Sequence, residues 1–218
     1  KKLYEEHGVV TIEDVRSLLE KHPKALNNKQ KIGVRYYEHL LNKIPRAEID
    51  EFQAIFEDIS DETMRMSING SYRRGLPESG DIDVLIASSS KSSRTRFIER
   101  LVSAGILVEE LAKGRKKYMG IGVLPDGSMY RRIDIIETTL EEFPFAQLYF
   151  TGSKDFNTYM RGVAVSQGFT MNEFGITHAD KTPLTEDEIA DRIGKTNFEN
   201  ERDIFDFLSI EWREPEER

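Results

Sequence analysis

The sequence contains no cysteine, and none of its apolar runs approaches the ~18 residues that a membrane-spanning helix needs. The first absence excludes disulfide bonds, thiolate zinc sites and a cysteine nucleophile, and it suits a reducing compartment. The second leads us to expect no membrane span. With 218 residues, 38% of them hydrophobic and 32% charged, the chain can bury a core in one large domain or a few subdomains.

Positive charge is also in deficit, because the formal net charge is −8. Taken alone, that value argues against a nucleic-acid partner, which requires clustered Lys and Arg. The acidity is C-terminal, however: residues 183–218 hold twelve Asp/Glu against five Lys/Arg, which leaves 27 acidic and 26 basic residues before them. Basic residues cluster at 73–74, 113–117 and 131–132. These clusters fit either a phosphate-binding surface or ordinary solvated charge.

Helical and strand-like patterns occupy different parts of the chain. Capping residues and helical spacing of apolar residues predict that residues 1–59 are helical, with Thr11 as an N-cap. Within this part, apolar residues recur at helical spacing over 32–41 and over 46–59. Short β-rich runs follow, and they predict strands at 64–69, 82–88, 118–124 and 131–137. Later helices are expected at 94–104, 153–166 and 200–208, and the acidic stretch 186–191 is expected to be a loop and a helix start.

Two carboxylates stand two positions apart at the start of a predicted strand. Side chains alternate across a strand, so Asp81 and Asp83 project from one face while their apolar neighbours project from the other. Such a pair is electrostatically costly unless a cation holds it, and Mg²⁺ favours a few carboxylates plus phosphate oxygens. An Asp-X-Asp on its own is more often a turn at an exposed edge than a metal site.

The residues in front of this pair strengthen the metal interpretation. Gly70 and Ser71 follow a predicted strand and offer backbone N–H groups and a hydroxyl at a tight turn, where a phosphate can approach closely. Arg74 adds a permanently charged donor fork, and Ser79-Gly80 repeats the Ser/Gly pair. The Gly70-Ser71 segment alone, or the Ser79-Gly80 segment alone, fits an ordinary loop between strands as well as it fits a phosphate site. Together they predict a phosphate cradle that opens on a metal site.

A third carboxylate, Asp134, lies in the predicted strand 131–137. Alternation puts Arg132 and Asp134 on one face, so Asp134 joins the first pair if the two strands are neighbours. Three carboxylates fit two metals in an in-line displacement, in which one metal lowers the pKa of an attacking hydroxyl and the other neutralises a triphosphate. Asp134 would be the nearest base.

Four motifs, in this order and spacing, resemble those of the family X DNA polymerases of the beta type. They are Gly-Ser-Tyr-Arg-Arg-Gly (70–75), Ser-Gly-Asp-Ile-Asp-Val (79–84), Arg-Arg-Ile-Asp-Ile (131–135) and Tyr-Phe-Thr-Gly-Ser (149–153). The resemblance extends over nearly the whole chain. It implies an α+β fold, with a nucleotidyltransferase palm built on a mixed β-sheet and flanked by two smaller parts. The expected bounds are 1–43 for a helical DNA-binding subdomain, 44–140 for the palm and 141–218 for a small α/β nucleotide-binding subdomain.

The same resemblance, carried over residue by residue, implies the site. The implied catalytic residues are Asp81, Asp83, Asp134 and Arg132, and the three aspartates would hold two Mg²⁺ ions, for which Mn²⁺ can substitute. The implied dNTP-binding residues are Gly70, Ser71, Arg74, Ser79, Gly80, Tyr149, Phe150, Gly152, Lys154 and Asn157. The implied DNA-binding residues are Lys113, Arg115, Lys117, Arg132 and Arg161. We expect the helix over 153–166 to close on a correct base pair.

The resemblance implies a template-directed DNA polymerase that fills short gaps in base-excision repair by adding dNMP from dNTP to a primer 3′-hydroxyl. Two alternatives stay open: a template-independent or small-acceptor nucleotidyltransferase with the same core, and a non-catalytic DNA-binding repair scaffold. The implied partners are gapped or primer-template DNA, dNTP and other repair proteins. We expect a monomer inside the cell, in the nucleus or alternatively the mitochondrion. None of these residues resembles the lyase domain of the family, so we expect no lyase activity from them.

Overall fold

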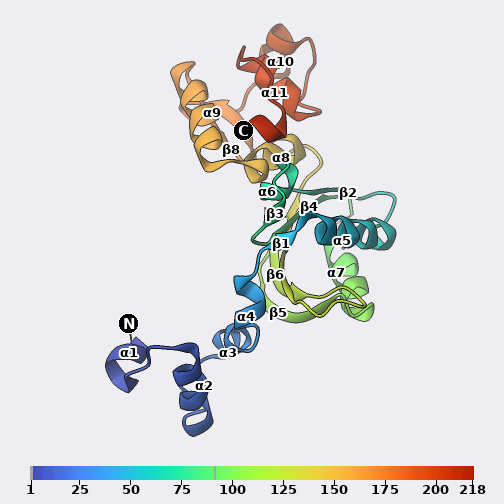
Figure 1. Cartoon of the computed structure of the whole chain (residues 1–218). Coiled ribbons are helices and arrows are strands. Elements are labelled where there is room, and N and C mark those ends of the chain that lie inside the picture. Colours follow the sequence, from blue (N-terminus) through green and yellow to red (C-terminus); the bar gives the residue numbers. More distant parts are fainter. Residues whose placement is uncertain (1, 91) are drawn as a thin grey trace.

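The computed structural model describes residues 2–90 and 92–218 (Figure 1). The helices before the sheet are α1 (Lys2–His7), α2 (Ile12–Lys21), α3 (Asn28–Arg35), α4 (Tyr37–Leu41) and α5 (Arg46–Ile59). The expected N-cap is present, because Thr11 Oγ1 accepts the Asp14 N–H at 3.1 Å and Asp14 Oδ2 accepts the Thr11 N–H at 2.8 Å. Helix α5 has the bounds that its apolar spacing predicts, and it buries Phe52 and Phe56.

Two expectations for this N-terminal part are wrong. The helix predicted over 32–41 is interrupted at Tyr36, where α3 ends and α4 begins, and the Tyr36 ring lies 4.7 Å from the Tyr130 ring. Residues 44–45 are not helical, because β1 (Ile44–Pro45) pairs with β3 (Glu78–Ser79). Both departures involve contacts with residues far along the chain, which no local pattern reports.

A five-stranded mixed sheet forms the centre of the molecule. Its strands are β2 (Arg65–Ile68), β4 (Ile82–Ala87), β5 (Leu107–Lys113), β6 (Lys117–Gly122) and β7 (Arg131–Thr138). The order is β2-β4-β7-β6-β5; β4 and β7 run parallel, and the other neighbours run antiparallel. The expected α+β class with a mixed sheet is therefore confirmed.

Helices cover one face of the sheet and part of the other. Helices α5 and α7 (Ser93–Ser103) pack on one face, where Phe52 and Phe97 join the inward residues of β4 and β7 in one hydrophobic core (Figure 1). On the opposite face, α8 (Phe143–Thr151) packs over Leu85 near the carboxyl ends of the same strands. The amino-terminal part of that second face is the place to which alternation assigns the acidic side chains.

Two elements of the structure escape the sequence patterns. Strand β5 lies at the edge of the sheet, and its sequence Leu-Val-Glu-Glu-Leu-Ala-Lys has low β propensity, so its pairing with β6 decides its conformation. Helix α8 contributes residues both to the core against the sheet and to the C-terminal core. A helix buried on most sides has no amphipathic period that a sequence pattern could detect.

The C-terminal part forms a second hydrophobic core, and Figure 1 shows it at the opposite end of the molecule from α1–α4. Its elements are α9 (Lys154–Ser166), β8 (Phe169–Asn172), β9 (Gly175–His178), α10 (Glu186–Ile193), α11 (Glu201–Phe207) and the 3₁₀ turn η1 (Pro215–Glu217). Phe156, Phe205 and Phe207 lie at its centre. In the described residues, none of the helices has the length and apolarity of a membrane span.

Two glycines provide a matched test of the packing. A Cβ on Gly122 in β6 would meet the Ile133 side chain and lie 2.8 Å from the Ile106 carbonyl oxygen, whereas a Cβ on Gly162 in α9 meets no described atom within 4 Å. We expect Gly122→Ala to lower the free energy of unfolding by about 1–3 kcal/mol. Gly162→Ala should raise it by about 0.5–1 kcal/mol, because alanine costs less entropy in a helix. Urea unfolding measures both, and a stabilised Gly122→Ala would contradict the packing.

Candidate active site

Three carboxylates meet on the open part of the second sheet face. Asp83 and Asp134 are directly opposite each other in the parallel pairing of β4 with β7, and Asp81 stands just before β4. One carboxylate oxygen from each residue lies within 4.8 Å of the other two. The structure therefore brings together the three aspartates that the sequence singles out.

This carboxylate cluster is partly buried and carries two cations. Burial raises the pKa of Asp83, the Asp134 carboxylate raises it further, and the positive charge of Lys117 opposes both effects. Lys117 Nζ lies 2.8 Å from Asp134 Oδ2, while Arg132 pairs with Asp81 and places Nε 3.6 Å from Asp134 Oδ1.

The donor set fits a divalent cation. Among the described residues, Asp134 Oδ1 is a buried oxygen without a hydrogen-bond partner, although the Asp134 side chain is only 2% exposed. Buried carboxylate oxygens ordinarily have a partner, and a small group of carboxylates open to solvent on one side is what Mg²⁺ and Mn²⁺ prefer. Asp81, Asp83 and Asp134 could therefore hold a metal.

The two Ser/Gly segments lie side by side next to the carboxylates. Gly70 and Ser71 begin the short helix α6 (Gly70–Arg73), so the tight turn expected there is wrong in detail. Ser71 Oγ donates to Ser79 Oγ at 2.8 Å, which joins the two segments. Gly70 has φ +63°, and a Cβ there would lie 3.0 Å from Asp83 Oδ2. Glycine is therefore required at this position by both backbone and contact.

Arg74 connects this cradle to the nucleotide-binding residues expected further along the chain. Its Nη1 donates to the Thr151 carbonyl oxygen at 2.6 Å and lies 3.2 Å from where a Cβ on Gly152 would be. Tyr149 and Asn157 face the same crevice as Arg161, and Asn157 Nδ2 donates to the Tyr149 carbonyl oxygen at 2.7 Å.

The remaining two residues of the expected nucleotide-binding set differ in exposure. Phe150, a residue of α8, packs against the core between α8 and the sheet, and Lys154 is exposed at the first position of α9. Of the later part of the expected set, the structure thus places Gly152 next to Arg74 of the cradle and leaves Lys154 on the surface.

One basic residue near the cradle carries no sequence signal. Lys43 is exposed, and its Nζ would lie 3.6 Å from a Cβ on Gly80. It reaches this position because Ile44, its neighbour, pairs with Ser79 across β1 and β3. Pairing of two-residue strands cannot be inferred from either segment alone, which is why the sequence pattern misses this residue.

The expected DNA-binding cluster 113–117 spreads in several directions. Lys113 and Arg115 are exposed, Lys117 faces Asp134, and Lys116 Nζ lies 3.1 Å from Glu142 Oε2 and 4.7 Å from the centre of the Phe174 ring. The cluster is therefore not one continuous basic stripe, and its DNA contacts stay a prediction.

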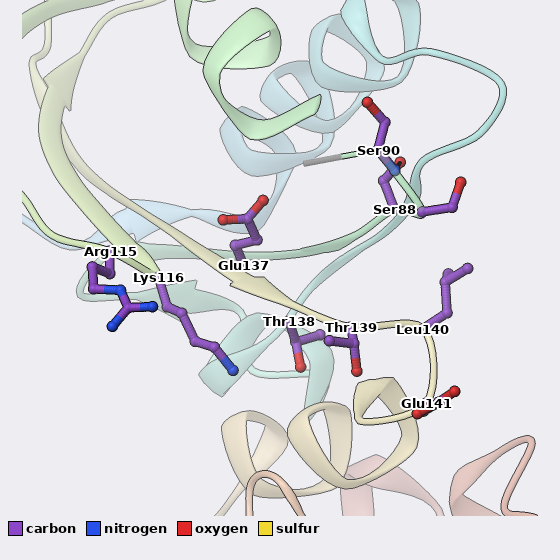
Figure 2. Close-up of a pocket in the computed structure, with 10 residues that line it drawn as sticks. Ser88, Ser90, Arg115, Lys116, Glu137, Thr138, Thr139, Leu140 and Glu141 are labelled. Atoms are coloured by element: carbon purple, nitrogen blue, oxygen red, sulfur yellow. Dashed lines mark hydrogen bonds between the residues drawn. The ribbon is translucent and has the colours of Figure 1, made fainter. Parts of the chain in front are cut away.

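A cavity of about 910 Å³ lies beside residues 113–117, lined by residues 88–90, Arg115, Lys116 and residues 137–141. Figure 2 draws the side chains that line it. The cavity lies at the carboxyl ends of β4 and β7 and includes none of the three aspartates.

Comparison with known families agrees with this geometry. The family model of the DNA polymerase beta palm matches residues 43–139, and that of the DNA polymerase beta thumb matches residues 146–218. The chain belongs to the family X DNA polymerases. Residues 1–42 and 140–145 lie outside the two matches. The palm match contains the whole sheet and all three aspartates, and the thumb match begins inside α8.

Named relatives of this family X chain include polymerases and a transferase. It is 30% identical to DNA polymerase lambda of Rattus norvegicus, over 100% of this chain and 39% of that protein. It is 26% identical to DNA nucleotidylexotransferase of Xenopus laevis, over 97% of this chain and 47% of that protein. A crystal structure of Leishmania infantum polymerase beta in a ternary P/T complex superposes with a TM-score of 0.83 at 29% identity, covering 99% of this chain and 91% of that one. The chain thus spans less than half the length of these curated relatives.

The contact between Gly70 and Asp83 gives a direct test of the metal site. In Gly70→Ala the new methyl group displaces the Asp83 carboxylate, so we expect Mn²⁺ affinity to fall roughly 10-fold or more, as for other disturbed ligand geometries. Gly168→Ala is the matched control, since Gly168 has φ +84° but meets no described atom within 4 Å. Both variants carry similar backbone strain. Electron paramagnetic resonance titration of Mn²⁺ distinguishes them, and equal weakening would refute the contact argument.

Proposed function

We propose that this chain is a template-directed DNA polymerase that fills short gaps by adding dNMP from dNTP to a primer 3′-hydroxyl. The observation that carries the proposal is the group of three carboxylates, with oxygens within 4.8 Å of one another, beside a Ser/Gly cradle. Relatives named polymerase lambda and polymerase beta support it. Because the chain spans less than half of its curated relatives, the activity, substrates and partners of the whole protein belong to the proposal.

In this proposal Asp81 and Asp83 hold two Mg²⁺ ions together with Asp134, and Mn²⁺ can replace them. When bound, such ions lower the pKa of the primer hydroxyl and neutralise charge on the triphosphate. Asp134 accepts the hydroxyl proton through its carboxylate, and Arg132 keeps the Asp81 carboxylate oriented through their ion pair.

The cradle positions the nucleotide. Backbone N–H groups at Gly70 and Gly80, the hydroxyls of Ser71 and Ser79, and the cations Lys43 and Arg74 bind the β- and γ-phosphates. The residues proposed to bind the sugar and base are Tyr149, Phe150, Gly152, Lys154 and Asn157. The residues proposed to bind DNA are Lys113, Arg115, Lys117, Arg132 and Arg161.

Residues of helix α9 favour a template-directed polymerase over an enzyme that adds nucleotides without a template. Asn157 and Arg161 share one crevice with Tyr149, and minor-groove acceptors that are common to all base pairs let such side chains check pair shape. A terminal transferase needs no such check. A non-catalytic scaffold is less well supported, because nothing selects for three clustered carboxylates in a protein that only binds DNA.

We further propose the organisation and setting of the protein. A helical DNA-binding subdomain spans 1–43, the palm 44–140 and the nucleotide-binding subdomain 141–218. The protein acts as a monomer on gapped or primer-template DNA together with other repair proteins, in the nucleus or alternatively the mitochondrion. The lack of cysteine, which suits a reducing compartment, is compatible with this setting.

Primer extension on a short DNA gap, with one dNTP offered at a time in Mg²⁺, tests the activity. We expect extension only by the complementary nucleotide and a loss of about 10²–10⁴-fold in Asp134→Ala, the range for losing a general base. Unchanged gap binding by the variant serves as the folding control. If the wild-type protein adds nucleotides regardless of the template, the assignment moves to a terminal transferase. If the wild-type protein binds the gap but extends no primer, the scaffold is favoured.

The position of Lys43 predicts a selective effect on nucleotide binding. In Lys43→Ala, one charge-assisted contact to a phosphate is lost. We expect the KM for dNTP to rise roughly 10-fold, while DNA affinity changes little. Lys113→Ala is the matched control, because Lys113 is also exposed but lies on the β5–β6 hairpin. We expect it to weaken DNA binding and leave the KM for dNTP unchanged. The same response in both variants would argue against a phosphate contact at Lys43.

A further inference from the structure

Lys117 contacts the most deeply buried of the three carboxylates. Its Nζ lies 2.8 Å from Asp134 Oδ2, and the Asp134 side chain is 2% exposed. The contact follows from strand pairing: Lys117 is opposite Ile136 on β7, and Asp134 is the diagonal neighbour on the same sheet face. The first residue of β6 is thus aimed into the carboxylate cluster by the register of the sheet.

The charges of the cluster explain why a cation stands there. Asp81, Asp83 and Asp134 place three carboxylates within 4.8 Å, and Arg132 balances one of them through Asp81. Without a second cation, Asp83 and Asp134 would face each other across β4 and β7 with only Arg132 nearby, whose Nε is 3.6 Å from Asp134 Oδ1. Lys117 supplies that cation from within the chain.

An ammonium group and a divalent ion cannot both hold the same carboxylate oxygen. They compete directly for Asp134 Oδ2, and an ion on Oδ1, the oxygen without a hydrogen-bond partner, would still be repelled by Lys117 on the same carboxylate. Lys117 is suited to leave: its side chain is 45% exposed, it stands beside the β5–β6 turn, and its flexible stem can swing into solvent. Arg132 is less free to leave, because its guanidinium is engaged by both Asp81 and Asp134.

We propose that Lys117 is a built-in counter-cation that pairs with the Asp134 carboxylate before metal arrives and opposes metal binding there until it leaves that carboxylate. The inference rests on the proposed function in one respect: DNA that draws Lys117 to a phosphate would free Asp134. DNA and metal then strengthen each other's binding by the same factor, because coupling between two sites is reciprocal. Lys117 is a positioning residue here, since it acts through Asp134.

The first experiment needs neither DNA nor nucleotide. In Lys117→Met, which keeps the length of the stem and removes the charge, we expect Mn²⁺ affinity to rise about tenfold by paramagnetic resonance titration. The melting temperature in EDTA should fall by a few degrees, because the carboxylates lose their counter-cation. Lys117→Arg, which retains the charge, should restore wild-type Mn²⁺ affinity or weaken it.

Two controls identify the site and the cause. Lys116→Met removes the same charge one residue away, where the side chain pairs with Glu142, and it should leave Mn²⁺ affinity unchanged. Asp83→Asn should abolish the titrated site. A lower melting temperature with unchanged Mn²⁺ affinity in Lys117→Met would show a purely structural lysine and overturn the proposal. Equal effects of Lys116→Met and Lys117→Met would overturn it too.

The second experiment repeats the Mn²⁺ titration with a short-gap DNA. We expect DNA to raise Mn²⁺ affinity in the wild-type protein and to raise it much less in Lys117→Met. Equal enhancement in both would overturn the coupling. These readouts are independent of extension, so an inactive protein that still shows the metal competition would refute the proposed polymerase activity and leave the counter-cation intact.

Discussion

Two carboxylates directly opposite each other on parallel strands repel, and the site is organised around that repulsion. Asp83 and Asp134 are fixed in register by β4 and β7, so neither can move away without breaking the centre of the sheet. Two cations offset this repulsion: Lys117 on β6 and Arg132 on β7 both lie close to Asp134. Gly70 adds close backbone contact at Asp83. The rigid sheet thus maintains a charge arrangement that a loop could not hold.

A buried ionic network connects this site to the C-terminal core. Glu201, at the start of α11, accepts Arg73 at 2.6 Å on one oxygen and Arg218 at 2.7 Å on the other. Arg73 also donates to Thr151 Oγ1, and Arg74 donates to the carbonyl oxygen of the same residue. Consecutive arginines at the end of the cradle therefore contact the segment before α9. Any shift of α8 or α11 relative to the cradle must change these contacts, which link the C-terminal core to the residues beside the carboxylates.

Local patterns predict most of this architecture, and the exceptions share a cause. Alternation puts Asp81 and Asp83 on one face of a strand, and proline followed by apolar spacing predicts α5 to the residue. The Lys117–Asp134 contact and the position of Lys43 depend on strand register, which is a property of two segments at once. The edge strand β5 and the buried helix α8 are determined by their neighbours rather than by their own residues. The sequence therefore identifies the carboxylates of the site, but it does not identify the lysines that strand pairing brings next to them.

The overall acidity of the chain gives little information about what the site attracts. The acidic excess lies in residues 183–218, which form α10, α11 and the last turn, whereas the carboxylate cluster lies on the central sheet at β4 and β7. Exposed charges are largely screened beyond ~8 Å at physiological ionic strength, so the charges next to the site matter more than the net charge of the chain. A phosphate backbone approaching the open sheet face meets the local cations Lys117 and Arg132, which stand beside the carboxylates. The distribution of charge, and not its sum, decides which partner this surface can bind.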